Sequence, residues 1–364
     1  MTPKKLIFID AFISFPLKFF ALFFKYINSF RSNNNSNLIL IVKFLGAGNY
    51  ISISHILNKS NYHVVTVKSN RNTLDKFAIS AKLFLIDERS FLTLFLTSFI
   101  LFFKLCFRKY ETVVNLESES AFAKLITSIP ASNNILGISN KHKSLFDNLF
   151  YSSYLVSPNL LSKPNTLNLL LNFSQITNQE VSDLINSHNN QFLLNCSNYD
   201  VNSISIAPTC SKTDNNRRIS SELWKQIVKK INSKIKITIL FQDQKDSQYQ
   251  SFKEISKEFN NIQIKICNYE QFVKSIKESC MLFTLDSQAL HVAQKIGKPS
   301  IAFYGPTSPY GVELKETTYV ISRSLVCSPC VHKYLNLPCK DKNYCMHFDI
   351  NDLEHALKEL IFLK

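Results

Sequence analysis

Residues 281–309 read MLFTLDSQALHVAQKIGKPSIAFYGPTSP, and this stretch decides the fold. Its first five residues are apolar and have the length of a buried strand. Asp286 and Ser287 follow, and both are residue types that begin helices. Apolar residues at helical spacing then continue to Gly297, which with a nearby proline is typical of a helix end. Because residues 300–304 are again apolar, the stretch predicts a strand–helix–strand unit.

The junction between the first strand and the helix is the first candidate for a binding site. A helix start carries unpaired N–H groups and the positive end of the helix dipole, which together favour a phosphate. Taken alone, Asp286 would more commonly be a helix cap, and His291 a hydrogen-bonded helix histidine. The site interpretation needs the motifs that surround these residues.

Five motifs stand in a fixed order in the second half of the chain. They are Asp286-Ser287-Gln288-Ala289-Leu290-His291, Gly297-Lys298-Pro299, Gly305-Pro306-Thr307-Ser308-Pro309, Cys327 with Cys330, and Cys345-Met346. In this combination they resemble the family 9 glycosyltransferases, the heptosyltransferase family of lipopolysaccharide synthesis. The resemblance extends over residues 38–363, strongly in the second half and loosely in the first.

The resemblance implies an α/β fold of the GT-B type, in which two Rossmann-like domains face a cleft. It implies inverting, metal-independent transfer of a sugar, heptose by expectation, from a nucleoside diphosphate such as ADP-heptose to a lipid-linked saccharide. No cofactor would be required for catalysis. The donor-binding residues would be Thr209, Ser211, Arg217, Asp286, Ser287, Gln288 and His291. Arg217 stands where the family has a phosphate-binding lysine, and taken alone it would be a solvated loop residue.

On the acceptor side the resemblance assigns Gly46, Gly48, Asn49 and Thr307, with Asn49 and Arg217 as the catalytic candidates. Asn49 occupies the position of the family's general base, an aspartate, and an amide cannot accept a proton as a carboxylate does. Another carboxylate such as Glu117 or Glu119 could act as the base, while Asn49 could only position the acceptor. Alternatively, the chain could be a non-catalytic relative that binds a glycolipid or a partner. Gln288 replaces a glycine and would crowd the pyrophosphate. Gly46 and Gly48 could also serve only tight packing.

Composition limits the function classes. The chain has 364 residues, 45% of them hydrophobic, and a formal net charge of +15. Such a charge suits an anionic membrane surface, phosphorylated substrates or nucleic acid. The basic residues form no Lys/Arg-rich tract, so we expect no nucleic acid partner. A zinc-containing nucleic-acid-binding protein is nevertheless the rival from another class. The incomplete glycine fingerprint at Gly46 and Gly48 argues against NAD.

The cysteines are not those of a secreted disulfide framework in a chain of this length. Their usage indicates a reducing, cytoplasmic setting. The last four are Cys327, Cys330, Cys339 and Cys345. Four thiolates could hold a structural zinc, although the spacing is not that of a paired zinc ribbon. Reduced structural cysteines or a labile disulfide are the alternatives.

Residues 6–30 are rich in Phe and Leu but too short in apolar run to span a bilayer, and they carry no obvious cleavage signal. A helix there would have one narrow, less apolar stripe of Lys18, Ala21, Lys25 and Asn28. We expect an amphipathic helix in the membrane interface, its lysines toward lipid head groups, on the cytoplasmic face of the inner membrane. Burial against the protein is the alternative. The apolar run 90–103 could equally be buried or touch lipid.

The remaining pattern divides the chain into five segments. They are a membrane-associating helix and linker (1–36), an acceptor-side Rossmann-like domain (37–171), a linker (172–202), a donor-binding Rossmann-like domain with the cysteines (203–349) and a terminal helix (350–364). Strands are expected at 38–42, 63–67, 111–117, 203–207, 235–241 and 262–266. Residues 146–171 read as mostly helical.

Overall fold

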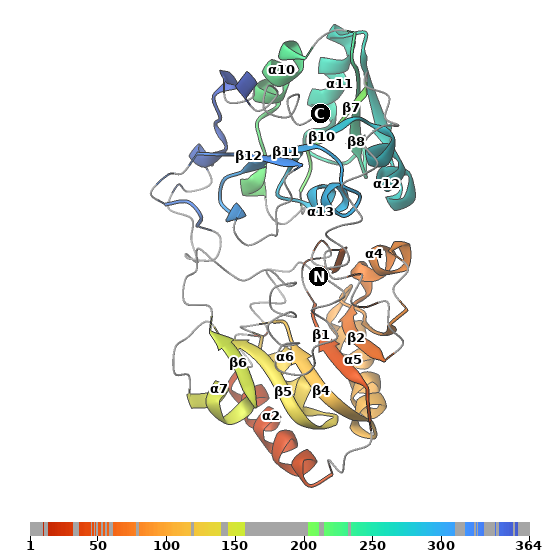
Figure 1. Cartoon of the computed structure of the whole chain (residues 1–364), viewed down its shortest axis with the longest axis vertical. Coiled ribbons are helices and arrows are strands. Elements are labelled where there is room, and N and C mark those ends of the chain that lie inside the picture. The colour runs from red at the N-terminus through yellow and green to blue at the C-terminus, as the bar shows by residue number, and fades with distance from the viewer. Residues whose placement is uncertain are drawn as a thin grey trace. The chain divides into compact units, whose positions relative to one another are not determined.

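A computed structural model of the chain divides into two compact units, Met1–Ser182 and Asp183–Lys364 (Figure 1). The structure describes residues 10, 14–31, 36–44, 46, 48, 50–51, 54, 57, 61–77, 80–117, 120–139, 145–156, 203–210, 215–231, 234–309, 317–323, 325, 327–330, 339, 342–351 and 354–355. The predicted linker at 172–202 lies outside these residues, as does most of the predicted terminal helix.

Unit 1 is built on a six-stranded parallel sheet of order β3-β2-β1-β4-β5-β6. Its strands are β1 (Ile39–Val42), β2 (Tyr62–Val67), β3 (Lys82–Ile86), β4 (Lys109–Asn115), β5 (Ala131–Ser139) and β6 (Ser153–Val156). Parallel order with helical crossovers requires helices on both faces, which explains why the central strand β1 is wholly apolar. The first two expected strands, 38–42 and 63–67, are confirmed to within one residue.

Alternate residues of β1 face two different helix layers. Leu40 belongs to an apolar cluster with α5 (Phe91–Cys106) and α6 (Ala121–Ser128). Ile41 belongs to a cluster on the other face with α4 (Arg71–Lys76). A short 3-10 turn, η1 (Lys68–Asn70), precedes α4.

The prediction that residues 146–171 are mostly helical is wrong where the structure describes them. The helix α7 (Leu145–Phe150) ends early, and β6 follows at once and pairs in parallel with β5. The Ser152 amide donates to the Ile135 carbonyl at 2.7 Å, which starts this pairing. A short Tyr-Leu-Val segment satisfies its backbone better at a sheet edge than in a further helical turn.

The helix α2 (Ser14–Ser29) lies against α6 and α7, and its orientation reverses the predicted one. Its less apolar stripe faces the protein: Ala21 and Asn28 are buried. The Lys25 Nζ donates to the carbonyl of Leu149 at 2.6 Å, and Lys18 lies over the Phe146 ring. These ammonium groups are therefore not turned to lipid head groups, because the carbonyl end and the rings of α7 bind them instead.

The opposite sides of α2 and α5 expose an apolar surface, which we call the aromatic face. It consists of Phe15, Phe19, Phe20, Phe23, Tyr26, Ile27, Phe30, Phe91, Leu92, Phe95, Leu96, Phe99, Ile100, Phe103 and Phe107. Among the described residues, the only other exposed large apolar side chains are Leu145, Leu149, Ile266 and Tyr344. Within the same residues, no helix has both the length and the apolar character required to cross a bilayer.

Unit 2 contains a second six-stranded parallel sheet, of order β12-β11-β10-β7-β8-β9. Its strands are β7 (Ser203–Ala207), β8 (Lys236–Phe241), β9 (Ile262–Ile266), β10 (Met281–Leu285), β11 (Ser300–Tyr304) and β12 (Thr318–Ser322), and its α-helices include α10 (Ser221–Lys230), α11 (Tyr249–Glu258), α12 (Tyr269–Glu278) and α13 (Gln288–Lys295). The strand–helix–strand unit expected from residues 281–304 is confirmed as β10, α13 and β11.

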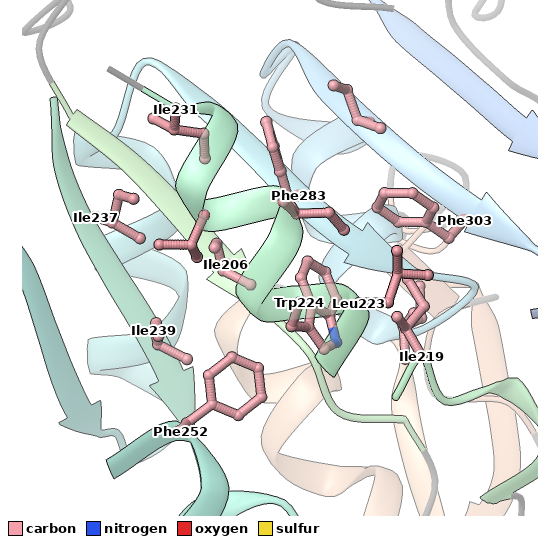
Figure 2. Close-up of a cluster of buried hydrophobic side chains, with 14 of the residues drawn as sticks. Ile206, Ile219, Leu223, Trp224, Ile231, Ile237, Ile239, Phe252, Phe283 and Phe303 are labelled. Atoms are coloured by element: carbon pink, nitrogen blue, oxygen red, sulfur yellow. The ribbon is translucent and has the colours of Figure 1, made fainter. Parts of the chain in front are cut away.

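The core of unit 2 forms where α10 and α11 cover the sheet (Figure 2). Trp224 of α10 is fully buried and lies edge-on to Phe303 of β11, with ring centroids 5.7 Å apart. Phe252 of α11 lies beside it at 6.2 Å. This packing fixes α10, and with it the loop that precedes α10, against the ends of the central strands.

Candidate functional site

The candidate site of unit 2 lies at the carboxyl ends of β7 and β10. These strands are parallel neighbours, with Ala207 paired to Thr284, so the residues that follow them leave the sheet at the same edge. Thr209 comes just after β7 and is half-buried. Ser211 lies outside the described residues.

Ser287 begins α13 as its N-cap. Its Oγ accepts from the Ala289 amide at 3.3 Å and lies 3.1 Å from Thr284 Oγ1. Thr284 Oγ1 is also 3.3 Å from the Ala207 carbonyl, to which it donates. A buried threonine thus joins the end of β7 to the start of α13, and it holds the positive helix end at this sheet edge.

Arg217 is brought to the same place by the short turn η3 (Asn215–Arg217) that precedes α10. Its Nη1 donates to the main-chain carbonyl of Asp286 at 2.7 Å and lies 3.2 Å from Asp286 Oδ2. Both side chains are largely buried, with 19% and 14% exposed. The two residues that the resemblance assigned to phosphate binding and to donor positioning are therefore in contact, although 69 positions separate them.

The neighbouring Arg218 has a different task. Its two terminal nitrogens lie 2.7 and 2.8 Å from the two carboxylate oxygens of Asp246, a bidentate pair in which each side chain is only 9% exposed. This pair ties the loop before α10 to the loop after β8. Arg218 therefore holds the backbone in place, whereas Arg217 reaches the start of α13.

His291 and Tyr304 lie in the electrostatic field of the Arg217–Asp286 pair. Burial lowers the pKa of His291, Asp286 opposes this change and Arg217 adds to it, so the imidazole is neutral at pH 7. Burial, with the Asp286 charge, raises the pKa of Tyr304 well above its usual value. Among the described residues, the buried Tyr304 hydroxyl and Thr307 Oγ1 have no hydrogen-bond partner. Buried hydroxyls without partners at a sheet edge suit a polar ligand.

Gln288, which replaces the glycine of the resemblance, points toward α12. Its Nε2 lies 3.1 Å from the hydroxyl of Tyr269, the first residue of that helix, to which it donates.

The next motif, Gly297-Lys298-Pro299, follows α13. Gly297 adopts φ 68°, the left-handed conformation that ends the helix. Lys298, the middle residue of that motif, is fully buried, and its ammonium binds the carbonyls of Lys277 and Ser279. Lys298 is therefore structural.

The cysteine segment supports the loop after β11. A Cβ on Gly305 would overlap the Met346 sulfur and meet Cys345 Sγ at 3.0 Å. The close packing of Cys345 and Met346 therefore requires glycine at position 305. The Cys330 amide donates to the Pro306 carbonyl at 2.9 Å. Burial and the nearby cysteines raise the pKa of Cys345 to about 11, which keeps its thiol protonated.

The structural zinc expected at Cys327, Cys330, Cys339 and Cys345 stays a prediction. Within the described part of the chain, which includes Cys327, Cys330, Cys339 and Cys345, no three Cys, His or carboxylate side chains gather into a metal-binding group. Those four cysteines also form no disulfide in this structure.

The acceptor-side residues lie in unit 1, after β1. Gly46 has φ 84°, a conformation that requires glycine, and Gly48 is buried at the start of the next helical turn. Asn49 lies outside the described residues, as does Glu119. Glu117 is held beside the turn: its Oε1 accepts from the Phe44 amide at 2.8 Å and lies 3.6 Å from Lys43 Nζ.

The sequence did not reveal Thr284, Tyr269 or Tyr304 as parts of the site. Thr284 and Tyr304 lie within apolar strands and read as core residues. The signal that could have identified Tyr304 is its position as the last residue of β11, directly before Gly305-Pro306 at the ligand edge.

The chain is similar to known proteins over most of its length. Residues 99–340 match the model of glycosyltransferase family 9 (heptosyltransferase). The structure resembles Escherichia coli heptosyltransferase WaaC with ADP-2-deoxy-2-fluoro heptose at a TM-score of 0.62 and 13% identity, covering 88% of this chain and 99% of that one. E. coli ADP-heptose lps heptosyltransferase II matches at a TM-score of 0.57 and 16% identity, covering 90% of this chain and 99% of that one. A family 9 glycosyltransferase from Veillonella parvula matches at a TM-score of 0.61 and 13% identity, covering 92% of this chain and 100% of that one. A comparison with curated protein sequences finds no match.

These likenesses confirm the predicted α/β fold class with two Rossmann-like units, of the GT-B type. At such low identities they establish the fold and carry no residue assignments.

Proposed function

Because the chain belongs to glycosyltransferase family 9 and is a glycosyltransferase, we propose that it transfers heptose from ADP-heptose, or from a similar nucleoside diphosphate sugar, to a lipid-linked saccharide. The donor proposal is supported by the structures of E. coli WaaC with ADP and with ADP-2-deoxy-2-fluoro heptose. The proposed place of work is the cytoplasmic face of the inner membrane, where a lipopolysaccharide core would be the acceptor.

The contact between Arg217 and the start of α13 carries this proposal. When the bond between the sugar and the nucleoside diphosphate breaks, negative charge develops on the departing diphosphate. A guanidinium and a helix N-terminus both stabilise that charge. A guanidinium has five N–H donors, so Arg217 can bind a phosphate while Asp286 fixes its position. The charges of Asp286 and Arg217 both act on His291 and on the hydroxyl of Tyr304, and these two side chains would position the donor.

The acceptor hydroxyl also requires a base. Glu117 is the described carboxylate tied to the turn that follows β1, through Phe44 and Lys43. We assign proton removal to Glu117 because Asn49 has no basic group. Replacing Glu117 by Gln should lower kcat roughly 10²–10⁴-fold and leave donor affinity unchanged.

The donor site is tested by calorimetric titration with ADP and by sugar transfer from ADP-heptose to a lipid A–Kdo acceptor. Arg217→Ala should weaken ADP binding about 10- to 100-fold, since it removes a charge-assisted bond to phosphate. Its kcat should fall roughly 10²–10³-fold, because the same group stabilises the leaving diphosphate. Arg217→Lys should be intermediate, since it keeps the charge but loses the forked geometry.

Lys257→Ala is the matched control. It removes one positive charge from an exposed pair with Glu254 on α11 of the same unit. It should leave ADP affinity and kcat unchanged. Equal ADP affinity for Arg217→Ala and the control would overturn the donor site, and a wild-type protein that transfers no sugar would overturn the proposed reaction.

A further inference from the structure

The aromatic face of unit 1 has no covering element among the described residues, although it is large for a soluble protein. Phe15 is 83% exposed, Phe19 is 64% and Phe95 of α5 is 59%. Single exposed apolar residues are ordinary, but a contiguous apolar surface marks an interaction site.

The face is contiguous because ring contacts run across both helices. Phe23 contacts Phe24 of α2, and Phe24 contacts Phe102 of α5 with ring centroids 5.4 Å apart. On α5 the contacts continue from Phe102 to Phe103 at 5.4 Å and from Phe103 to Phe99 at 4.9 Å. α2 and α5 therefore present one apolar surface.

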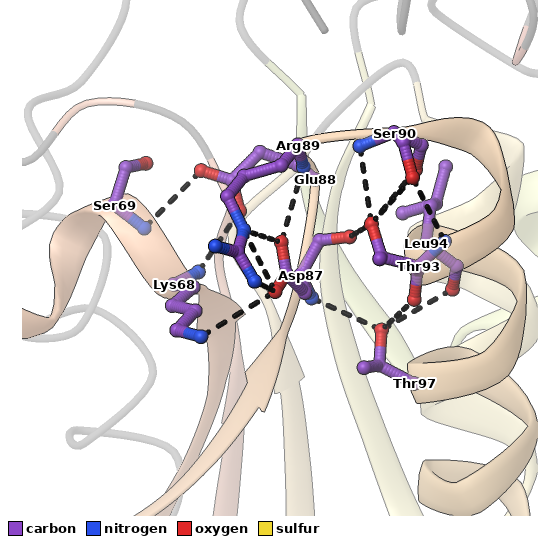
Figure 3. Close-up of polar contacts among 9 residues, drawn as sticks. All are labelled: Lys68, Ser69, Asp87, Glu88, Arg89, Ser90, Thr93, Leu94 and Thr97. Atoms are coloured by element: carbon purple, nitrogen blue, oxygen red, sulfur yellow. Dashed lines mark hydrogen bonds and ion pairs between the residues drawn. The ribbon is translucent and has the colours of Figure 1, made fainter.

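Several polar side chains of both helices make hydrogen bonds on the inner side. Asn28 Nδ2 donates to the Ser128 and Ile129 carbonyls at 2.9 and 2.7 Å, which fastens α2 to the end of α6. Thr97 Oγ1 of α5 accepts from the Asp87 amide at 3.0 Å, and Thr93 Oγ1 donates to the Asp87 carbonyl at 3.1 Å (Figure 3). The polarity of these helices is thus the reverse of that on a water-facing helix.

Exposed basic residues lie near the C-terminal end of α5. Neither α2 nor α5 contains an acidic residue. Exposed Lys104 lies in the last turn of α5, and exposed Lys109 begins β4. Arg31 follows α2, but its Nη1 donates to Asn28 Oδ1 at 3.0 Å on the inner side.

We propose that the aromatic face of α2 and α5 docks on an anionic lipid bilayer, with Lys104 and Lys109 at the phosphate level. Phenylalanines enter the boundary between head groups and acyl chains, while basic residues bind the anionic head groups. A second copy of the chain is disfavoured, because neither α2 nor α5 carries an acidic residue that could pair with the basic residues of another copy. This inference deepens the membrane location proposed above and does not depend on which sugar is transferred.

The first experiment is sedimentation of the full chain with vesicles of phosphatidylglycerol and phosphatidylethanolamine, without any donor or acceptor sugar. The wild type should bind these vesicles and bind phosphatidylcholine vesicles much less. Raising the salt from about 0.1 to about 0.5 M should weaken the binding. Phe19→Ser/Phe99→Ser should lower the partition coefficient about tenfold or more.

Ile266→Ser/Tyr344→Ser is the matched control, since it removes the two large exposed apolar side chains found in the described part of unit 2 and should leave vesicle binding unchanged. Equal vesicle binding by Phe19→Ser/Phe99→Ser and the wild type would overturn the proposal. So would wild-type self-association in sedimentation velocity that the same double substitution abolishes, since a second copy would then occupy the face.

A second readout reports insertion directly. The chain has one tryptophan, Trp224, which is fully buried in unit 2. Brominated lipid in the vesicles should therefore not quench the wild-type fluorescence but should quench Phe99→Trp. Absence of quenching in Phe99→Trp would overturn the proposal, whereas sugar transfer measured on a soluble acceptor fragment would be unaffected either way.

Discussion

The helices that cover the two units have opposite surfaces. On unit 2, the buried side of α12 is Phe272 and Ile276, and its exposed side carries Lys274 and Glu278, an ion pair at 3.7 Å. On unit 1, α5 is apolar on both sides. The same helical spacing therefore serves two purposes: α12 of unit 2 turns charged residues to water, whereas α2 and α5 of unit 1 turn aromatic rings to the surface.

The largest expected effect tests the contrast between the buried aromatic residues of unit 2 and the exposed ones of unit 1. Trp224→Ala should cost about 3–5 kcal/mol of unfolding free energy, because it leaves a cavity among Phe303 and Phe252. The melting temperature of unit 2, followed by circular dichroism, should fall by roughly 6–20 °C.

Phe99→Ala is the contrasting substitution on the aromatic face. Phe99 is 55% exposed, so its removal should change the unfolding free energy by less than about 0.5 kcal/mol. A loss at Phe99 as large as that at Trp224 would mean that the aromatic face is packed in the free protein, and the contrast between the units would fail.

A smaller effect tests how α2 is fastened. Asn28→Ala removes both donors from the Ser128 and Ile129 carbonyls and should cost about 1–3 kcal/mol. Hydrogen exchange of the α6 amides should accelerate accordingly, because α2 covers that helix. Ser29→Ala, on the exposed side of the same turn, should change the exchange rates little. Unchanged α6 exchange in Asn28→Ala would show that ring packing alone holds α2.

Local sequence patterns predicted much of the fold. The bounds of β9, β10 and β11 agree with the expected strands because each is a short apolar run between turn residues. The orientation of α2 did not follow from its pattern. A helical stripe shows which residues share a side, but it does not say whether that side meets protein, water or lipid.

The candidate site divides in the same way. Ser287 as an N-cap followed from residue type alone. The contact of Arg217 with Asp286 followed only from the family resemblance, since no local rule joins residues 69 positions apart. Tyr304 was missed because a tyrosine that ends an apolar strand has the same pattern whether its hydroxyl lies in a core or at a ligand edge.

The smallest expected effect is on the pH dependence of stability, and it tests the charged site of unit 2. Burial lowers the pKa of His291 below its usual 6.5, so below pH 6.5 the unfolded chain binds a proton that the folded unit does not. The stability of unit 2, followed by Trp224 fluorescence, should therefore be constant above pH 6.5 and fall as the pH drops below it. His291→Gln should flatten this part of the profile.

The His291 pKa, measured by NMR, should respond in opposite directions to its two charged neighbours. Asp286→Asn should lower it further, because the carboxylate favours the imidazolium, and Arg217→Ala should raise it. Equal shifts in the same direction would mean that His291 does not lie in the field of this pair. The charges of unit 2 would then not be gathered at the start of α13, and the difference between the two units would rest on the aromatic face alone.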